Sequence, residues 1–200
     1  MQEIKAILPA KDKWVSLVWQ VNDWCNFRCT YCSEWNWAGR NKNDTDIPLI
    51  VDTLERIMLH YKAKGYKYFK LYLSGGEPTF WKALIPVVEK FREHAEWPGS
   101  CVGINTNFSK PLSWWEDHHH LFEDVVASYH AEWSKDDKYM DVYKFLQDKK
   151  NYLCSRIMMH HDHFQQCIDF GDRIKNECDN YMIEYAPVYD ELRPSTDPYH

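Results

Sequence analysis

Short apolar runs alternate along the chain with longer segments whose apolar residues recur at helical spacing. Residues 14–21 are rich in β-branched and aromatic side chains, which is typical of a buried strand. The apolar positions of residues 47–63 fall on one helical face, with Asp46 and Pro48 marking the start of that helix and Gly65 its end. The pattern therefore predicts a strand followed by an amphipathic helix.

The same alternation continues to the end of the chain. Further strands are predicted at 66–73, 101–107, 125–131, 152–159 and 181–186, with helices at about 80–95, 111–122, 136–149 and 162–178. Repeated strand–helix order predicts an α/β fold with a parallel sheet and right-handed crossovers. We expect one domain over residues 1–200, with its strands and helices at about 14–186. An irregular tail at 187–200 would stand where the last helix is missing.

The composition narrows the function classes. Apolar residues make up 44% of the chain and charged residues 27%, which is ordinary for a soluble globular protein. The net charge is −6 and the Lys and Arg residues are scattered, which argues against nucleic-acid binding. The sequence has no apolar run of membrane-spanning length and no signal-peptide layout. We therefore expect no membrane partner and a cytoplasmic location, with the seven cysteines reduced.

Three of these cysteines stand close together directly after the first predicted strand. Cys25, Cys29 and Cys32 have C-x3-C-x2-C spacing. Three thiolates on one loop suit a single soft-metal centre, yet they are one ligand short of the four that zinc or a cubane cluster prefers. The spacing favours a metal or cluster site over three buried apolar cysteines. It does not separate an iron–sulfur cluster from a zinc site that a distant His completes.

Polar residues also collect where the other predicted strands end. They are Ser74 to Thr79 after the second strand, Asn105 and Asn107 at the end of the third, Ser128, His130 and Glu132 at the end of the fourth, His160 and His161 at the end of the fifth, and Glu184 near the end of the sixth. Active sites of parallel sheets lie at the carboxyl ends of the strands. Cysteines that merely fill a core would not predict polar strand ends, so this convergence favours a functional site.

Two of these motifs together resemble the signature of the radical SAM superfamily. The first is the cysteine motif, with aromatic Tyr31 just before its third cysteine. The second is Ser-Gly-Gly-Glu-Pro at 74–78, which resembles the glycine-rich element that binds S-adenosylmethionine (SAM) in that family. The resemblance covers about residues 14–186 and implies a partial (β/α)6 barrel.

The resemblance also implies a cofactor set and a reaction. Cys25, Cys29 and Cys32 would hold three irons of a [4Fe–4S] cluster, and SAM would chelate the fourth iron. One electron, from a donor such as flavodoxin or ferredoxin, would cleave SAM to a 5′-deoxyadenosyl radical that abstracts hydrogen from a substrate. That substrate would be a peptide or a small metabolite.

The SAM-binding residues are expected from the same resemblance. Gly75 and Gly76 allow close backbone approach to a ligand, and Glu77 either contributes to SAM binding or orients the loop. Asn105 and Asn107 resemble the amide-bearing tip of the family's third strand. Ser128 and His130 share a strand face, and Ser128 is the candidate for the SAM carboxylate or ribose. The expected cofactor-binding set is Tyr31, Ser74, Gly75, Gly76, Glu77, Asn105, Asn107, Ser128, His130, Arg156 and Glu184.

Several alternatives stay open at this point. The polar strand ends could be satisfied groups of a barrel end without a ligand. Within radical SAM enzymes, a deazapurine-forming or a glycyl-radical-activating type is an alternative. Outside enzymes, the chain could be an iron–sulfur or zinc-binding module on a degenerate barrel.

Overall fold

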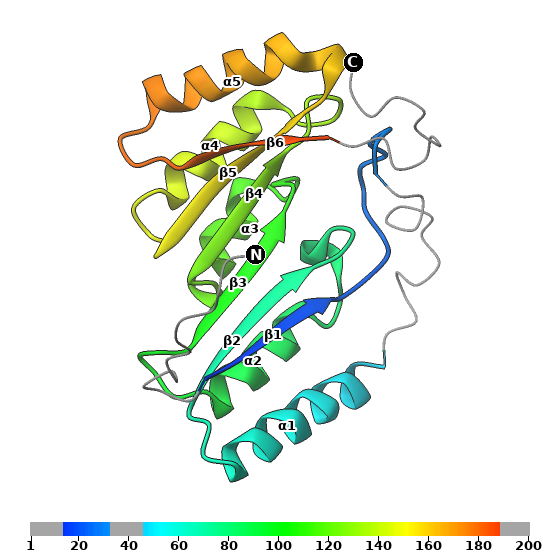
Figure 1. Cartoon of the computed structure of the whole chain (residues 1–200), viewed down its shortest axis with the longest axis vertical. Helices are drawn as coiled ribbons and strands as arrows, with labels where there is room; N and C mark the ends of the chain where they lie inside the picture. Colours follow the sequence, from blue (N-terminus) through cyan, green and yellow to red (C-terminus); the bar gives the residue numbers. More distant parts are fainter. Residues whose placement is uncertain (1–13, 33–45, 189–200) are drawn as a thin grey trace, which may run out of the picture.

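Six parallel strands form one sheet in the order β1-β2-β3-β4-β5-β6 (Figure 1). The structure is a computed structural model that describes residues 14–32 and 46–188. The strands are β1 (Trp14–Gln20), β2 (Tyr68–Ser74), β3 (Cys101–Thr106), β4 (Asp124–Tyr129), β5 (Tyr152–Met159) and β6 (Ile183–Pro187). β1 and β6 are the edges of the sheet, so the barrel is open along one side. The predicted α/β class with a partial parallel barrel is confirmed.

Helices connect consecutive strands. They are α1 (Ile47–Ala63), α2 (Leu84–His94), α3 (Leu112–His118), α4 (Asp136–Leu146) and α5 (Phe164–Glu177). The start of α1 is capped because the Asp46 side chain accepts a hydrogen bond from the Leu49 amide at 3.0 Å. Gly65 follows the helix with a φ of +83°, a conformation that suits glycine. In the described ranges, no helix is long and apolar enough to cross a membrane.

The two faces of the sheet have different surroundings. In β2, Phe69, Leu71 and Leu73 are buried and join one apolar cluster with residues of α1 and α2, among them Met58 and Phe91. The intervening β2 residues are only half-buried, because side chains alternate between faces along a strand. The helices therefore cover one face, and the other face lines the interior of the open barrel (Figure 1).

Several predicted element ends differ from the structure, and two of them bear on the site. A 3₁₀ turn at Pro78–Phe80 precedes α2, which therefore begins at Leu84 instead of residue 80. The sixth strand lies at Ile183–Pro187, so the predicted position of Glu184 near its end is wrong; Glu184 is the second residue of β6. Most of the tail expected to be irregular, 189–200, lies outside the described residues. The single-domain boundary stays a prediction.

Candidate active site

The three clustered cysteines line a cavity at the carboxyl ends of the strands. Its volume is about 230 Å³. It is lined by Cys25, Phe27, Cys29, Cys32, Ser74, Gly75, Gly76, Glu77, Asn105, Thr106, Asn107, Ser128, His130, Arg156 and Met158. The fold thus brings together the cysteine loop and residues from the ends of four strands, whose positions at strand ends predicted that they would lie close together. Of the expected set, Tyr31 and Glu184 are absent from the lining.

The glycine-rich loop positions the first cysteine through its backbone. The Gly76 amide donates to the Asn22 carbonyl at 3.0 Å, and the Glu77 amide donates to the Trp24 carbonyl at 2.8 Å. A Cβ on Gly76 would lie 2.1 Å from the Trp24 oxygen and 2.9 Å from the Cys25 nitrogen. Only glycine permits this approach. The loop therefore holds the chain just before Cys25, in addition to lining the cavity.

Glu77 connects the loop after β2 to the end of β3. Its side chain is 1% exposed and accepts four hydrogen bonds from three residues. Thr79 donates through both its amide and its hydroxyl, Thr106 through its hydroxyl, and the Asn107 amide reaches the second carboxylate oxygen at 2.7 Å. Burial raises the pKa of Glu77, whereas these donors oppose the rise. This geometry favours loop orientation, the second of the two roles considered for Glu77.

Two asparagines extend from the end of β3 toward the cavity. The Asn107 side-chain amide donates to the Asn26 side-chain oxygen at 3.0 Å, and its nitrogen lies 3.7 Å from the Cys25 sulfur. The Asn105 side-chain amide is 3.5 Å from the Ser74 hydroxyl oxygen. Asn107 therefore contacts the cysteine loop directly, while Asn105 joins the ends of β2 and β3.

Tyr31 contacts His130 and does not line the cavity. The Tyr31 hydroxyl lies 2.6 Å from the His130 Nδ1, and the Cys29 sulfur lies 3.4 Å from the same nitrogen. Burial raises the pKa of Tyr31 and lowers the pKa of His130 to about 4, so the phenol keeps its proton and the imidazole is neutral. We assign the Tyr31 hydroxyl as the donor to Nδ1, which leaves the His130 proton on Nε2.

Thr30 attaches the cysteine loop to the far side of the sheet. Its amide donates to the Glu132 carboxylate at 3.1 Å, and its hydroxyl lies 3.1 Å from the His160 Nε2.

Glu132 and His160 belong to the polar strand ends found in the sequence but were not among the expected ligands. Phe27, Thr106 and Met158 were missed altogether. For Met158 a signal existed, because it lies two residues beyond Arg156 on the same strand face.

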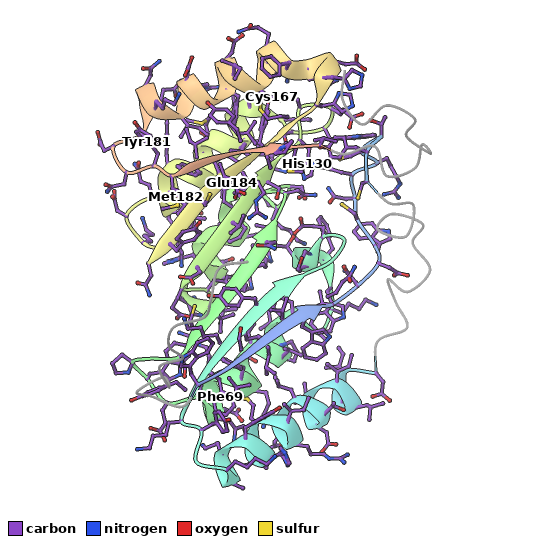
Figure 2. The ribbon with its side chains drawn as sticks, viewed as in Figure 1. Phe69, His130, Cys167, Tyr181, Met182 and Glu184 are labelled. Carbon is purple, nitrogen blue, oxygen red and sulfur yellow. The ribbon has the colours of Figure 1, made fainter. Side chains whose placement is uncertain are left out.

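Ser128, Arg156 and Glu184 form a row across three neighbouring strands. They are partners in the registers of β4 with β5 and of β5 with β6. The Arg156 Nε donates to the Glu184 carboxylate at 2.8 Å, so Glu184 orients Arg156 from outside the cavity lining. In Figure 2, His130 lies toward the carboxyl ends of the strands, and Glu184 lies farther back along the sheet.

The three clustered cysteines are free thiols on one loop. Their donor set fits a thiolate-ligated cluster. Burial raises the pKa of Cys25 to about 11 and that of Cys29 to about 12, so cluster binding would release protons.

The sequence model of the radical SAM superfamily matches residues 19–118, half of the chain. The chain belongs to the radical SAM superfamily. This match contains both the cysteine motif and the glycine-rich loop. It confirms the family that the two motifs indicated.

Radical SAM relatives with curated names cover only part of this chain. A GTP 3′,8-cyclase of Rhizobium leguminosarum bv. trifolii is 38% identical over 90 residues, which are 45% of this chain and 24% of the relative. A GTP 3′,8-cyclase of Mannheimia succiniciproducens is 36% identical over 69 residues, 34% of this chain and 19% of the relative. The matched region thus spans about a quarter or less of these relatives' length.

A solved structure supports the same fold. The crystal structure of BtrN in complex with AdoMet and 2-DOIA aligns with a TM-score of 0.50 and 22% identity, over 73% of this chain and 58% of BtrN. At this identity the likeness concerns the radical SAM fold alone. The roles of the individual cavity residues of this chain stay predictions.

Proposed function

We propose that this chain is a radical SAM enzyme in which Cys25, Cys29 and Cys32 ligate a [4Fe–4S] cluster and the surrounding cavity binds SAM. The observation that carries the proposal is the shared cavity, because one space is lined by the three thiols, the glycine-rich loop and the polar strand ends. When bound and reduced, the cluster would supply the electron that cleaves SAM to a 5′-deoxyadenosyl radical. An external one-electron donor such as flavodoxin or ferredoxin would reduce it.

The chain's own residues would bind and orient SAM. Ser128 and Arg156 lie side by side on the cavity wall, where a hydroxyl and a guanidinium suit a carboxylate or a ribose. Glu184 orients the Arg156 guanidinium by accepting a hydrogen bond from its Nε. Asn105 lines the cavity with its side-chain amide directed to Ser74, and His130 lines it with its Nδ1 hydrogen-bonded to Tyr31.

The cavity of this chain does not favour GTP, the substrate in the names of the relatives, as its own substrate. GTP carries a triphosphate, for which several cationic side chains are usual. Arg156 is the one Lys or Arg in the lining of the described cavity, and it is already paired with Glu184. We therefore keep the broader proposal of hydrogen abstraction from a peptide or a small metabolite.

The test is SAM cleavage by the anaerobically reconstituted and reduced protein. We expect 5′-deoxyadenosine to accumulate, and we expect its formation to be lost in Cys29→Ala. Cys167→Ala is the matched control, since Cys167 is also buried but packs in the core of α5. No 5′-deoxyadenosine from a protein with an intact cluster and several reductants would contradict the proposal and favour a non-catalytic iron–sulfur module.

A further inference from the structure

A second cavity lies on the inner face of the sheet, next to the first. Its volume is about 180 Å³. It is lined by Tyr72, Gly103, Ile104, Asn105, Asp124, Val126 and Tyr152. Asn105 also lines the cysteine cavity, so the two spaces adjoin at this residue. The second cavity contains no residue of the cysteine loop or the glycine-rich loop and is not needed to explain SAM binding.

One wall of this cavity forms because Gly103 has no side chain. Tyr72, Gly103 and Asp124 lie in one row, since they are partners in the registers of β2 with β3 and of β3 with β4. A Cβ on Gly103 would lie 2.4 Å from a ring carbon of Tyr72. Glycine therefore lets the Tyr72 ring lie against β3, where its hydroxyl reaches 3.4 Å from an Asp124 carboxylate oxygen.

Asp124 presents a carboxylate to this cavity and forms no ion pair within residues 14–32 and 46–188. Its Oδ2 accepts hydrogen bonds from the Cys101 thiol at 3.1 Å and from the Tyr72 hydroxyl. Burial raises the pKa of Cys101 to about 12 and also raises that of Tyr72, so both groups keep their protons and donate. Among the described residues, no Lys, Arg or His forms an ion pair with Asp124. Lys70, beside Cys101 across the sheet, holds its ammonium over the Trp14 ring.

We infer that this second cavity binds an ammonium group of the substrate, with Asp124 as its anionic partner. The inference rests on the proposed function, because it places the substrate beside the SAM cavity. A carboxylate flanked by the aromatic residues Tyr72 and Tyr152, in an otherwise largely apolar space, favours a cation over an anion or a neutral group. A ligand anchored at Asp124 extends past Asn105 toward the cysteine cavity. Both a small amine and a lysine side chain of a peptide offer this ammonium.

Matched probes of nearly the same shape test the inference. Cyclohexylamine and cyclohexanol would be titrated into the reconstituted protein, with binding followed by saturation-transfer NMR. We expect the amine to bind about tenfold more tightly, because a charge-assisted hydrogen bond is stronger than a neutral one. Asp124→Asn keeps the size of the side chain and should abolish the preference. Asp141→Asn, an exposed aspartate on α4, should keep it. Equal binding of both probes to the wild type, or a preference that survives in Asp124→Asn, would overturn the inference.

A second comparison separates the two sources of the ammonium and the two proposals. A short peptide with one lysine would be compared with its norleucine counterpart. Tighter binding of the lysine peptide, in addition to the cyclohexylamine preference, would identify a peptide substrate, whereas a preference for cyclohexylamine alone would identify a small amine. SAM cleavage by the wild type is measured without these probes. Failure of that assay with the amine preference intact would therefore refute the proposed reaction and leave the ammonium site standing.

Discussion

Replacement of Gly76 by alanine tests how the glycine-rich loop positions the cysteine loop. The added Cβ would lie 2.1 Å from the Trp24 carbonyl oxygen and 2.9 Å from the Cys25 nitrogen, both backbone atoms. To relieve the overlap, the two segments must separate by about 1 Å, a shift that would break the backbone hydrogen bonds from Gly76 and Glu77. Each of the two bonds contributes about 0.5–1.5 kcal/mol, so we expect the free energy of unfolding to fall by roughly 1–3 kcal/mol.

The free energy of unfolding of the apoprotein would be measured by urea denaturation, and the iron content after anaerobic reconstitution. We expect both to fall in Gly76→Ala, because the displaced segment carries Cys25. Gly171→Ala is the matched control. Its Cβ would also meet an atom at 2.1 Å, but that atom is the hydroxyl of Tyr185, a half-exposed side chain that can move aside. The control should stay within about 1 kcal/mol of the wild type and keep its iron. Wild-type stability and iron content in Gly76→Ala would refute this account of the loop.

Three further substitutions test other contacts of the site. In the wild type, four hydrogen-bond donors meet the Glu77 carboxylate, and Glu77→Gln replaces one of its oxygens by an NH2 group that is itself a donor. Urea denaturation should show a fall of about 1–3 kcal/mol in the free energy of unfolding. Tyr31→Phe removes the hydrogen bond to the His130 ring, and the same measurement should show a loss of about 1 kcal/mol. Arg156→Ala breaks a partly exposed ion pair with Glu184, so stability should change by less than about 1 kcal/mol, while calorimetry should show weaker SAM binding to the reconstituted protein.

Two of these substitutions have a matched control. Tyr181→Phe changes an exposed tyrosine and should leave stability unchanged; an equal loss in both Tyr variants would remove the specific role of the Tyr31 hydroxyl. Arg173→Ala breaks surface ion pairs on α5 and should leave SAM affinity unchanged. Unaltered SAM affinity in Arg156→Ala would remove that residue from the binding site. Full stability of Glu77→Gln would show that its charge is not needed in the loop.

The architecture followed from local sequence patterns. The helix predicted at 47–63 and the strand predicted at 152–159 have these bounds in the structure, because their apolar periodicity and flanking residues leave little choice. Parallel strands then bring their carboxyl ends together, which placed the cysteines, Ser74 and Asn107 at one edge. The family resemblance was also confirmed.

Other features depend on contacts between residues far apart in the chain. The approach of Gly76 to Trp24 and the contact of Tyr31 with His130 join segments whose relative placement no local pattern specifies. Glu184 was misplaced because residues 181 and 182 continue the apolar pattern, whereas β6 begins only at Ile183. The second cavity at Asp124 was missed because it forms where Gly103 has no side chain and the Tyr72 ring lies against β3. No local sequence pattern indicates this contact between two strands.

The most direct test of the central claim is the electron paramagnetic resonance spectrum of the reduced, reconstituted protein with and without SAM. If Cys25, Cys29 and Cys32 leave one iron open to SAM, the spectrum of a [4Fe–4S] cluster should change when SAM is added. It should change little with 5′-methylthioadenosine at the same concentration, since that analogue lacks the amine and carboxylate that would chelate the open iron. A cluster spectrum that SAM leaves unaltered, in protein that holds four irons per chain, would contradict the claim that the cysteine cavity is a SAM site.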